Sequence, residues 1–189
     1  MLSTAILAAA LSTSSAAAKD RPIADHTQAV TVVATGIFEP RLELDYDKSL
    51  SDKTSYTAGV TVGRYNNLLL RFINAVSEDK LVVNQFGAYG GYNYHFKHFN
   101  RGWYASGIAR YDHIGATFGE EPAGSYSRIA VGPALGWKVA TEGGFTFKWD
   151  LGLGYGTHLG YKAGSSNANM GKPVNGVVGL GSLNMGMSF

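Results

Sequence analysis

The side chains best suited to nucleophilic chemistry lie in one segment near the end of the chain. His158 is followed by Ser165 and Ser166, with Asn167 beside them. A serine nucleophile needs its hydroxyl within hydrogen-bond reach of an imidazole that a third group orients. Ser165 lies seven positions after His158, in a polar stretch. A polar surface loop is therefore the favoured interpretation, and a catalytic pair is the alternative.

A larger set of ionisable residues occurs at alternate positions of extended segments and mixes both signs. We expect these side chains to pair with one another if they share the interior of one fold. The favoured hypothesis is a paired charge network that fills a narrow lumen, because eight strands leave an interior just wide enough for side chains. A narrow passage for an ion or small solute is the alternative. The predicted network consists of Arg41, Glu43, Asp45, Arg110, Asp112, Lys138, Lys148 and Asp150.

Other chemistry finds little support. The glycine-rich run Gly152 to Gly156 resembles a phosphate loop only in its letters, because no helix follows to bind an anion. His26, His113 and His158 are too scattered to propose a metal site, and the chain has no cysteine. We predict no cofactor. A formal net charge of +2 is too small to indicate nucleic acid.

The stretch 144–156, GFTFKWDLGLGYG, alternates strictly between large apolar side chains and small or charged ones. A period of two indicates an extended strand with two different faces. With 25 glycines and 12% aromatic residues, the composition also favours β structure. We predict eight extended segments and no amphipathic helix, at about 28–37, 41–50, 55–72, 81–97, 102–114, 128–139, 144–156 and 176–189.

In these segments, the face opposite the large apolar side chains carries both charge and glycine, whereas a solvated sheet surface would be uniformly polar. In a transmembrane barrel the outer face is apolar and the interior polar, and inward glycines leave room for long charged side chains. The sheet must also close, since hydrocarbon offers no partner to an unpaired edge. Short connections at 51–54, 98–101 and 141–143 alternate with longer ones at 74–80, 116–124 and 161–175, with a short exception at Glu39-Pro40. The pattern predicts an all-β fold, an eight-stranded antiparallel up-and-down transmembrane β-barrel.

Aromatic side chains concentrate near the strand ends on the apolar faces. Trp and Tyr are enriched at membrane interfaces, although aromatic residues are also good strand formers. We predict a membrane girdle of Tyr92, Tyr94, Phe96, Trp103, Trp137, Phe145, Phe147, Trp149 and Tyr155.

The first 18 residues are uncharged, contain an apolar run and end in Ala16-Ala17-Ala18 before Lys19. This pattern is typical of a secretory signal peptide, and the run is too short to span a bilayer. We therefore predict a signal peptide at 1–18, a short leader at 19–27 and the barrel at 28–189.

The last residues alternate into a terminal phenylalanine, through Leu183, Met185, Met187 and Phe189. This end resembles the assembly signal of bacterial outer-membrane barrels. The pieces at 41–46, 92–96, 102–104, 144–147 and 152–155 look like the uncharacterised eight-stranded families grouped with OmpA/OmpW-like barrels. The resemblance implies location in the bacterial outer membrane, contact with its lipid, recognition of the last strand by the barrel-assembly machinery, and a monomer.

The resemblance supports no particular activity. We expect a non-enzymatic barrel with a mostly filled polar lumen, serving envelope structure, surface interaction or passage of a small solute. An alternative is a lipid A-modifying enzyme, although His158 and Ser165 lack the deacylase-like His-x-Ser-Asn spacing. A second alternative is a soluble lipocalin-like carrier, in which the same apolar residues would face inward.

Overall fold

The computed structural model describes residues 25–33, 41–65, 81–165 and 172–189. These residues form eight strands. They contain no helix, and thus none long and apolar enough to cross a membrane. The strands are β1 (Gln28–Val33), β2 (Arg41–Ser51), β3 (Thr54–Tyr65), β4 (Leu81–His95), β5 (Arg101–Phe118), β6 (Glu121–Ala140), β7 (Phe145–Ala163) and β8 (Gly176–Ser188).

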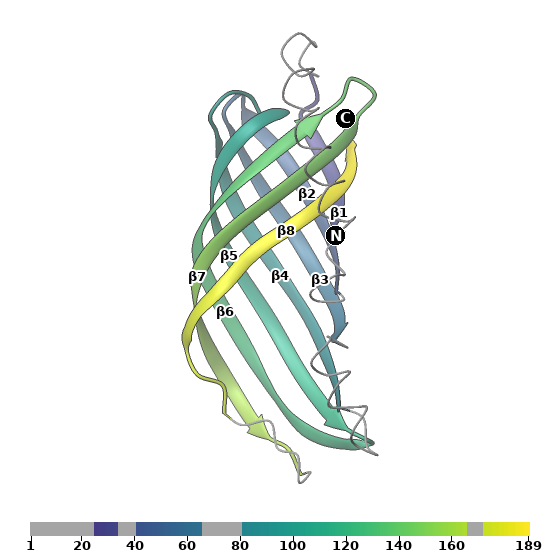
Figure 1. The fold of residues 1–189 in the computed structure, drawn as a ribbon, viewed down its shortest axis with the longest axis vertical. Helices are drawn as coiled ribbons and strands as arrows, with labels where there is room; N and C mark the ends of the chain where they lie inside the picture. The colour runs from purple at the N-terminus through teal and green to yellow at the C-terminus, as the bar shows by residue number, and fades with distance from the viewer. Residues whose placement is uncertain (1–24, 34–40, 66–80, 166–171) are drawn as a thin grey trace, which may run out of the picture.

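The strands form a single closed barrel in which each one pairs antiparallel with its neighbours in sequence (Figure 1). β1 closes the ring by pairing with β8, from Ala29 opposite Ser188 to Val33 opposite Asn184. The amides of Thr27 and Gln28 extend this closure by donating to the carbonyl of Phe189 at 3.1 and 3.0 Å. The predicted eight-stranded antiparallel up-and-down barrel is confirmed in these residues.

The two ends of the barrel differ. At one end, which we call the short-turn end, lie the turns at 52–53, 96–100 and 141–144, together with the start of β1 and the end of β8. The opposite end, which we call the loop end, carries the β5–β6 turn and the segment between β7 and β8. The predicted short connections at this short-turn end are confirmed, whereas the longer connection predicted at 74–80 lies outside the described residues.

The connection between β5 and β6 is much shorter than the predicted loop at 116–124. Only Gly119 and Glu120 turn, and the strand resumes at Glu121. Gly119 adopts a φ of 61°, which glycine reaches without a steric penalty. A register shift after Ala116 places Pro122 opposite Thr117. Proline has no backbone N–H to donate in a regular ladder, and the register shift accommodates Pro122 within β6. In the sequence this proline indicates a turn, so the predicted loop is too long.

The remaining boundaries differ less. β7 continues to Ala163, past the predicted start of a loop at Tyr161. The expected continuation of the first strand to 37, the turn at Glu39-Pro40, the third strand beyond 65 and the signal peptide lie outside the described residues. Of the predicted leader, 25–27 is irregular chain immediately before β1.

The barrel is apolar outside and polar inside. Leu151, Leu153 and Val62 point outward and are 71%, 65% and 65% exposed. The alternate positions of the same strands point into the lumen, where Lys148 and Thr61 are buried. Polar side chains outnumber apolar ones among the buried residues, the reverse of a water-soluble core. The predicted orientation of the two faces is therefore confirmed.

Inward-facing glycines make room for side chains that lie along the inner wall from the neighbouring strand. A Cβ on Gly59 would lie 2.4 Å from the Tyr89 ring, and one on Gly136 would lie 2.3 Å from the Tyr104 ring. The space is therefore used, as predicted, by long side chains from other strands. Here those side chains are tyrosines as well as charged residues.

The space at Gly136 gives a test of the packing. We expect Gly136→Ala to destabilise the barrel by about 1–3 kcal/mol, because its Cβ would overlap the buried Tyr104 ring and the Trp149 carbonyl. Urea unfolding followed by tryptophan fluorescence measures the change. Gly107→Ala is the matched control, since nothing lies within 4 Å of its Cβ. Equal stability of the two variants would contradict the described packing.

Candidate functional site

Three carboxylates lie in a row along the inner face of β2. Glu43, Asp45 and Asp47 occupy alternate positions and are 1%, 1% and 2% exposed. A carboxylate removed from water is costly unless it is paired and hydrogen-bonded. β2 therefore needs cations on the facing wall of the lumen.

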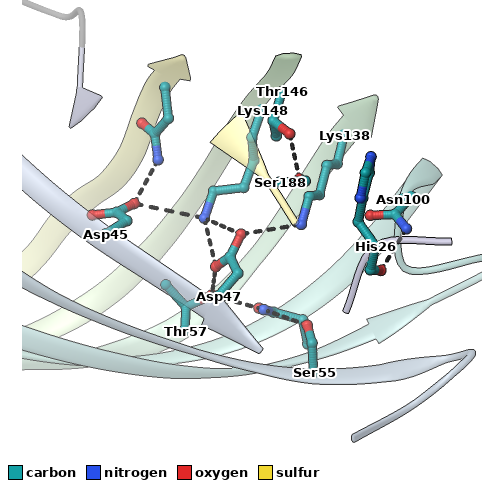
Figure 2. A network of polar contacts seen from close by, with 12 residues as sticks. His26, Asp45, Asp47, Ser55, Thr57, Asn100, Lys138, Thr146, Lys148 and Ser188 are labelled. Atoms are coloured by element: carbon teal, nitrogen blue, oxygen red, sulfur yellow. Dashed lines mark hydrogen bonds and ion pairs between the residues drawn. The ribbon is translucent and has the colours of Figure 1, made fainter. Parts of the chain in front are cut away.

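Asp47 pairs with two cations (Figure 2). Lys148 on β7 places its Nζ 3.1 Å from Oδ1, and Lys138 on β6 places its Nζ 3.3 Å from Oδ2. The Thr57 hydroxyl donates to Oδ1 at 2.5 Å. One carboxylate thus contacts two buried ammonium groups and links β2 to β6 and β7.

Asp45 lies beside this centre and shares one of its cations. The Lys148 Nζ is 3.6 Å from the Asp45 Oδ2, which also accepts a hydrogen bond from the Asn184 amide at 2.6 Å. The Tyr89 hydroxyl donates to the other carboxylate oxygen. Its donors come from β4, β7 and β8, so the interaction again spans the lumen.

Arg110 forms a second charge centre toward the loop end. Its guanidinium lies 3.2 Å from Glu43 and 2.9 Å from Asp112. Asp112 also pairs with Arg128 at 2.8 Å and accepts a hydrogen bond from Gln85 at 2.6 Å. Both carboxylates are buried, and the guanidinium of Arg110 bridges them.

Asp150 takes neutral partners. The Ser182 hydroxyl donates to its Oδ2 at 2.8 Å, and the Tyr104 hydroxyl donates to the same oxygen at 3.2 Å. The structure thus places Glu43, Asp45, Arg110, Asp112, Lys138, Lys148 and Asp150 inside the lumen, as predicted. The side chain of Arg41 lies outside the described part of the molecule.

The β4–β5 turn closes the lumen at the short-turn end. Phe99 and Asn100 are 1% and 0% exposed although they belong to a turn. The Lys138 Nζ lies 3.6 Å from the centre of the Phe99 ring, a cation–π contact. The Asn100 amide donates to the carbonyl of His26 at 2.7 Å. The turn residues therefore close the barrel at its short-turn end, next to the charge network.

Little free space remains between these groups. A cavity of about 30 Å³ lies among Tyr89, Tyr104, Lys148 and Asp150. A cavity of this size holds about one water molecule. Side chains of the charge network surround this cavity on several strands.

The candidate catalytic residues are not brought together. The His158 imidazole and backbone amide both contact the Asn175 side chain, at 3.2 and 2.8 Å. His158 pairs in register with Arg128, whereas the Ser165 amide donates to the Pro122 carbonyl, several residue pairs farther along the sheet. Ser166 lies outside the described residues. Geometry therefore gives no support to a His158–Ser165 pair.

The aromatic side chains of the predicted girdle are on the outer face. Six of them are exposed, while Trp137, Phe147 and Trp149 are half-buried against neighbouring rings; Trp103 and Trp149, for example, meet at 5.4 Å. Met185, Met187 and Phe189 of the predicted assembly signal are also exposed, and Leu183 is half-buried. The exposed girdle members are Tyr92, Tyr94, Phe96, Trp103, Phe145 and Tyr155.

The charge network has members beyond the predicted ones. Asp47 and Arg128 were omitted, although both occupy the same alternating faces as the residues that were included. Tyr89, Tyr104 and Asn184 were also missed, because an uncharged polar side chain on an inner face gives no strong signal. Within the described residues, no group of three or more His, Cys, Asp or Glu side chains could hold a metal ion.

We expect Asp47→Asn to destabilise the barrel by about 3–5 kcal/mol, because it leaves Lys138 without its carboxylate and Lys148 with only the more distant Asp45. Urea unfolding measures the loss. Asp52→Asn, at an exposed turn, is the control and should change the stability by less than about 0.5 kcal/mol. Adding Lys138→Met to Asp47→Asn should recover part of the loss. A double variant as unstable as the sum of the two single variants would contradict the pairing.

No protein-family model matches this chain, and no curated protein or solved structure matches it either. The arrangement of its own residues must therefore carry any argument about function.

Proposed function

We propose that this chain is a non-enzymatic β-barrel of the bacterial outer membrane, with a closed lumen and a role in envelope structure or surface interaction. The observation that carries the proposal is the inverted distribution of side chains. Leu42, Leu151 and Tyr155 are 62%, 71% and 61% exposed, whereas Glu43 and Lys148 are buried. Exposed apolar surface on this scale marks a membrane or protein contact.

The distribution argues against the soluble lipocalin-like alternative. Such a carrier would hold a ligand against inward apolar residues, but these residues form the outer wall. Strand lengths fit the membrane interpretation. β2 to β8 have 11 to 20 residues each, and a tilted spanning strand needs about 9 to 11. The closed ring leaves no edge to be satisfied in hydrocarbon.

A filled lumen favours a structural or surface role over solute passage. The charge network occupies the middle of the barrel, and Phe99 closes the short-turn end. At the loop end, β5, β6 and β7 have 18 to 20 residues, more than a bilayer requires. Their loop-end parts would stand clear of the membrane and offer a surface to other molecules. The barrel-assembly machinery would recognise the outward side chains Leu183, Met185, Met187 and Phe189 of the last strand.

The membrane contact can be tested at Leu151. We expect the native chain to float with lipid vesicles and to show heat-modifiable gel mobility, as a closed barrel does. Leu151→Arg should lower stability in vesicles by about 2–4 kcal/mol, because a guanidinium would replace an apolar side chain in hydrocarbon. Val174→Arg is the matched control, since Val174 is 85% exposed just before β8. Equal effects of the two substitutions would mean that Leu151 faces water.

The closed lumen gives a separate test. In planar bilayers, we expect the reconstituted barrel to produce no stepwise ion currents, because paired side chains occupy its interior. Insertion is checked by recovering heat-modifiable protein from vesicles prepared in the same way. Regular conductance steps from correctly folded protein would contradict the closed lumen and indicate a passage for ions.

A further inference from the structure

We propose that a hollow on the outer face of β2, β3 and β4 binds one phosphate-bearing membrane lipid, with its phosphate on Arg64 and an acyl chain along the barrel wall. The inference rests on the proposed function, because it needs this face to lie in a membrane. It adds a specific lipid site to the general contact with the bilayer.

The hollow is a cavity of about 590 Å³, in the size range of small-molecule sites. Most of its side chains come from even-numbered positions, which face outward on these strands. Gly63 and Gln85 pair in register and contribute from between the outward positions. The hollow is thus part of the outer wall and is separate from the charged lumen. The lining residues are Leu42, Val62, Gly63, Arg64, Asn84, Gln85 and Phe86.

The floor of the hollow is apolar and open. Leu42, Val62 and Phe86 are 62%, 65% and 57% exposed, and they occupy three neighbouring strands in one row. The Phe86 ring packs against His113 at 5.0 Å, which supports one side of the row. Hydrocarbon is the natural occupant of such a floor, since burying it removes large apolar side chains from water.

A cation stands at the loop-end edge of this floor. Arg64 is exposed on the outer face and lies opposite Asn84, one outward position beyond Val62 and Phe86. In the part of the chain that the structure describes, no ion pair joins Arg64 to a carboxylate, whereas Arg110 and Arg128 are paired inside the lumen. A guanidinium forms bidentate hydrogen bonds with phosphate, and the Asn84 amide could supply another donor. This charge selects a phosphate headgroup as the polar end of the ligand.

The wall toward the short-turn end leaves space for an acyl chain. Ala88 and then Gly90 follow Phe86 on the outer face of β4, and Ala58 lies opposite Gly90 on β3. A Cβ on Gly90 would find no atom nearer than 3.8 Å, so this surface is open. Tyr111, which is 43% exposed and lies opposite Ala88, borders the track. These small residues continue the apolar floor toward the short-turn end, between the exposed Val60 on β3 and Tyr111 on β5.

The test measures binding of phosphatidic acid to the purified, folded barrel in detergent micelles. Diacylglycerol with the same chains lacks the phosphate, and inorganic phosphate lacks the chains. We expect Arg64→Gln to raise the Kd for phosphatidic acid roughly tenfold, since it removes a charge-assisted contact. Gly90→Leu, which obstructs the track, should raise it about threefold. The matched controls are Lys53→Gln at an exposed turn and Gly179→Leu on the outer face of β8, where nothing lies within 4 Å of a Cβ.

Each outcome bears on the site. Weaker binding by Arg64→Gln and Gly90→Leu, with both controls within about twofold of the native Kd, supports it. Equal losses in Arg64→Gln and Lys53→Gln, or equal binding of phosphatidic acid and diacylglycerol, overturns it. Displacement by inorganic phosphate without any effect of Gly90→Leu would indicate a free-anion site and overturn the lipid assignment. Heat-modifiable mobility verifies the fold of every variant. Failure of the native chain to float with vesicles would instead reject the proposed membrane location.

Discussion

The interaction on which the barrel depends is the compensation of charge inside a lumen too narrow to hydrate it. Asp47 pairs with the ammonium groups of both Lys138 and Lys148, Asp45 shares Lys148, and all four side chains are buried. Removing one partner of such a group leaves a buried charge without its counter-ion. The signs are therefore arranged by strand, with the carboxylates of Glu43, Asp45 and Asp47 on β2 and most of the cations on β5, β6 and β7. The ion pairs run across the barrel as well as along its wall.

This arrangement explains why the inner faces combine charge with glycine. A phenolic ring can lie over the neighbouring strand, and reach the strand beyond it, only where that neighbour carries no side chain in its path. Gly59 admits the Tyr89 ring on its way to Asp45, and Gly136 admits the Tyr104 ring on its way to Asp150. The hydroxyls end on carboxylates, so the rings fill volume and satisfy polar groups together. The same residues therefore fill the interior and provide hydrogen bonds to its buried carboxylates.

Alternation in the sequence was enough to predict the two faces, because each strand has a strict period of two. It correctly placed Leu151 outside and Lys148 inside. It could not predict which ions pair, since the partner of Asp47 depends on strand tilt and register across the closed ring. The β5–β6 hairpin was missed because Pro122 and Gly124 indicate a loop locally. In the structure a register shift keeps both within strand β6, a solution that only the pairing with β5 specifies.

The side chains inside the lumen also limit the space for a ligand there. Its middle holds space for about one water, and a buried phenylalanine closes its short-turn end. The hollow on the outer wall is much larger, at about 590 Å³. On the outer wall, most of the apolar face is uniform, but over β2 to β4 it is hollowed and bordered by Arg64. In hydrocarbon an unpaired guanidinium would be costly, while at a headgroup layer it gains a phosphate. In the proposed membrane location, Arg64 lies one outward position beyond Val62 and Phe86, so the bilayer boundary on this side of the barrel would lie near that row.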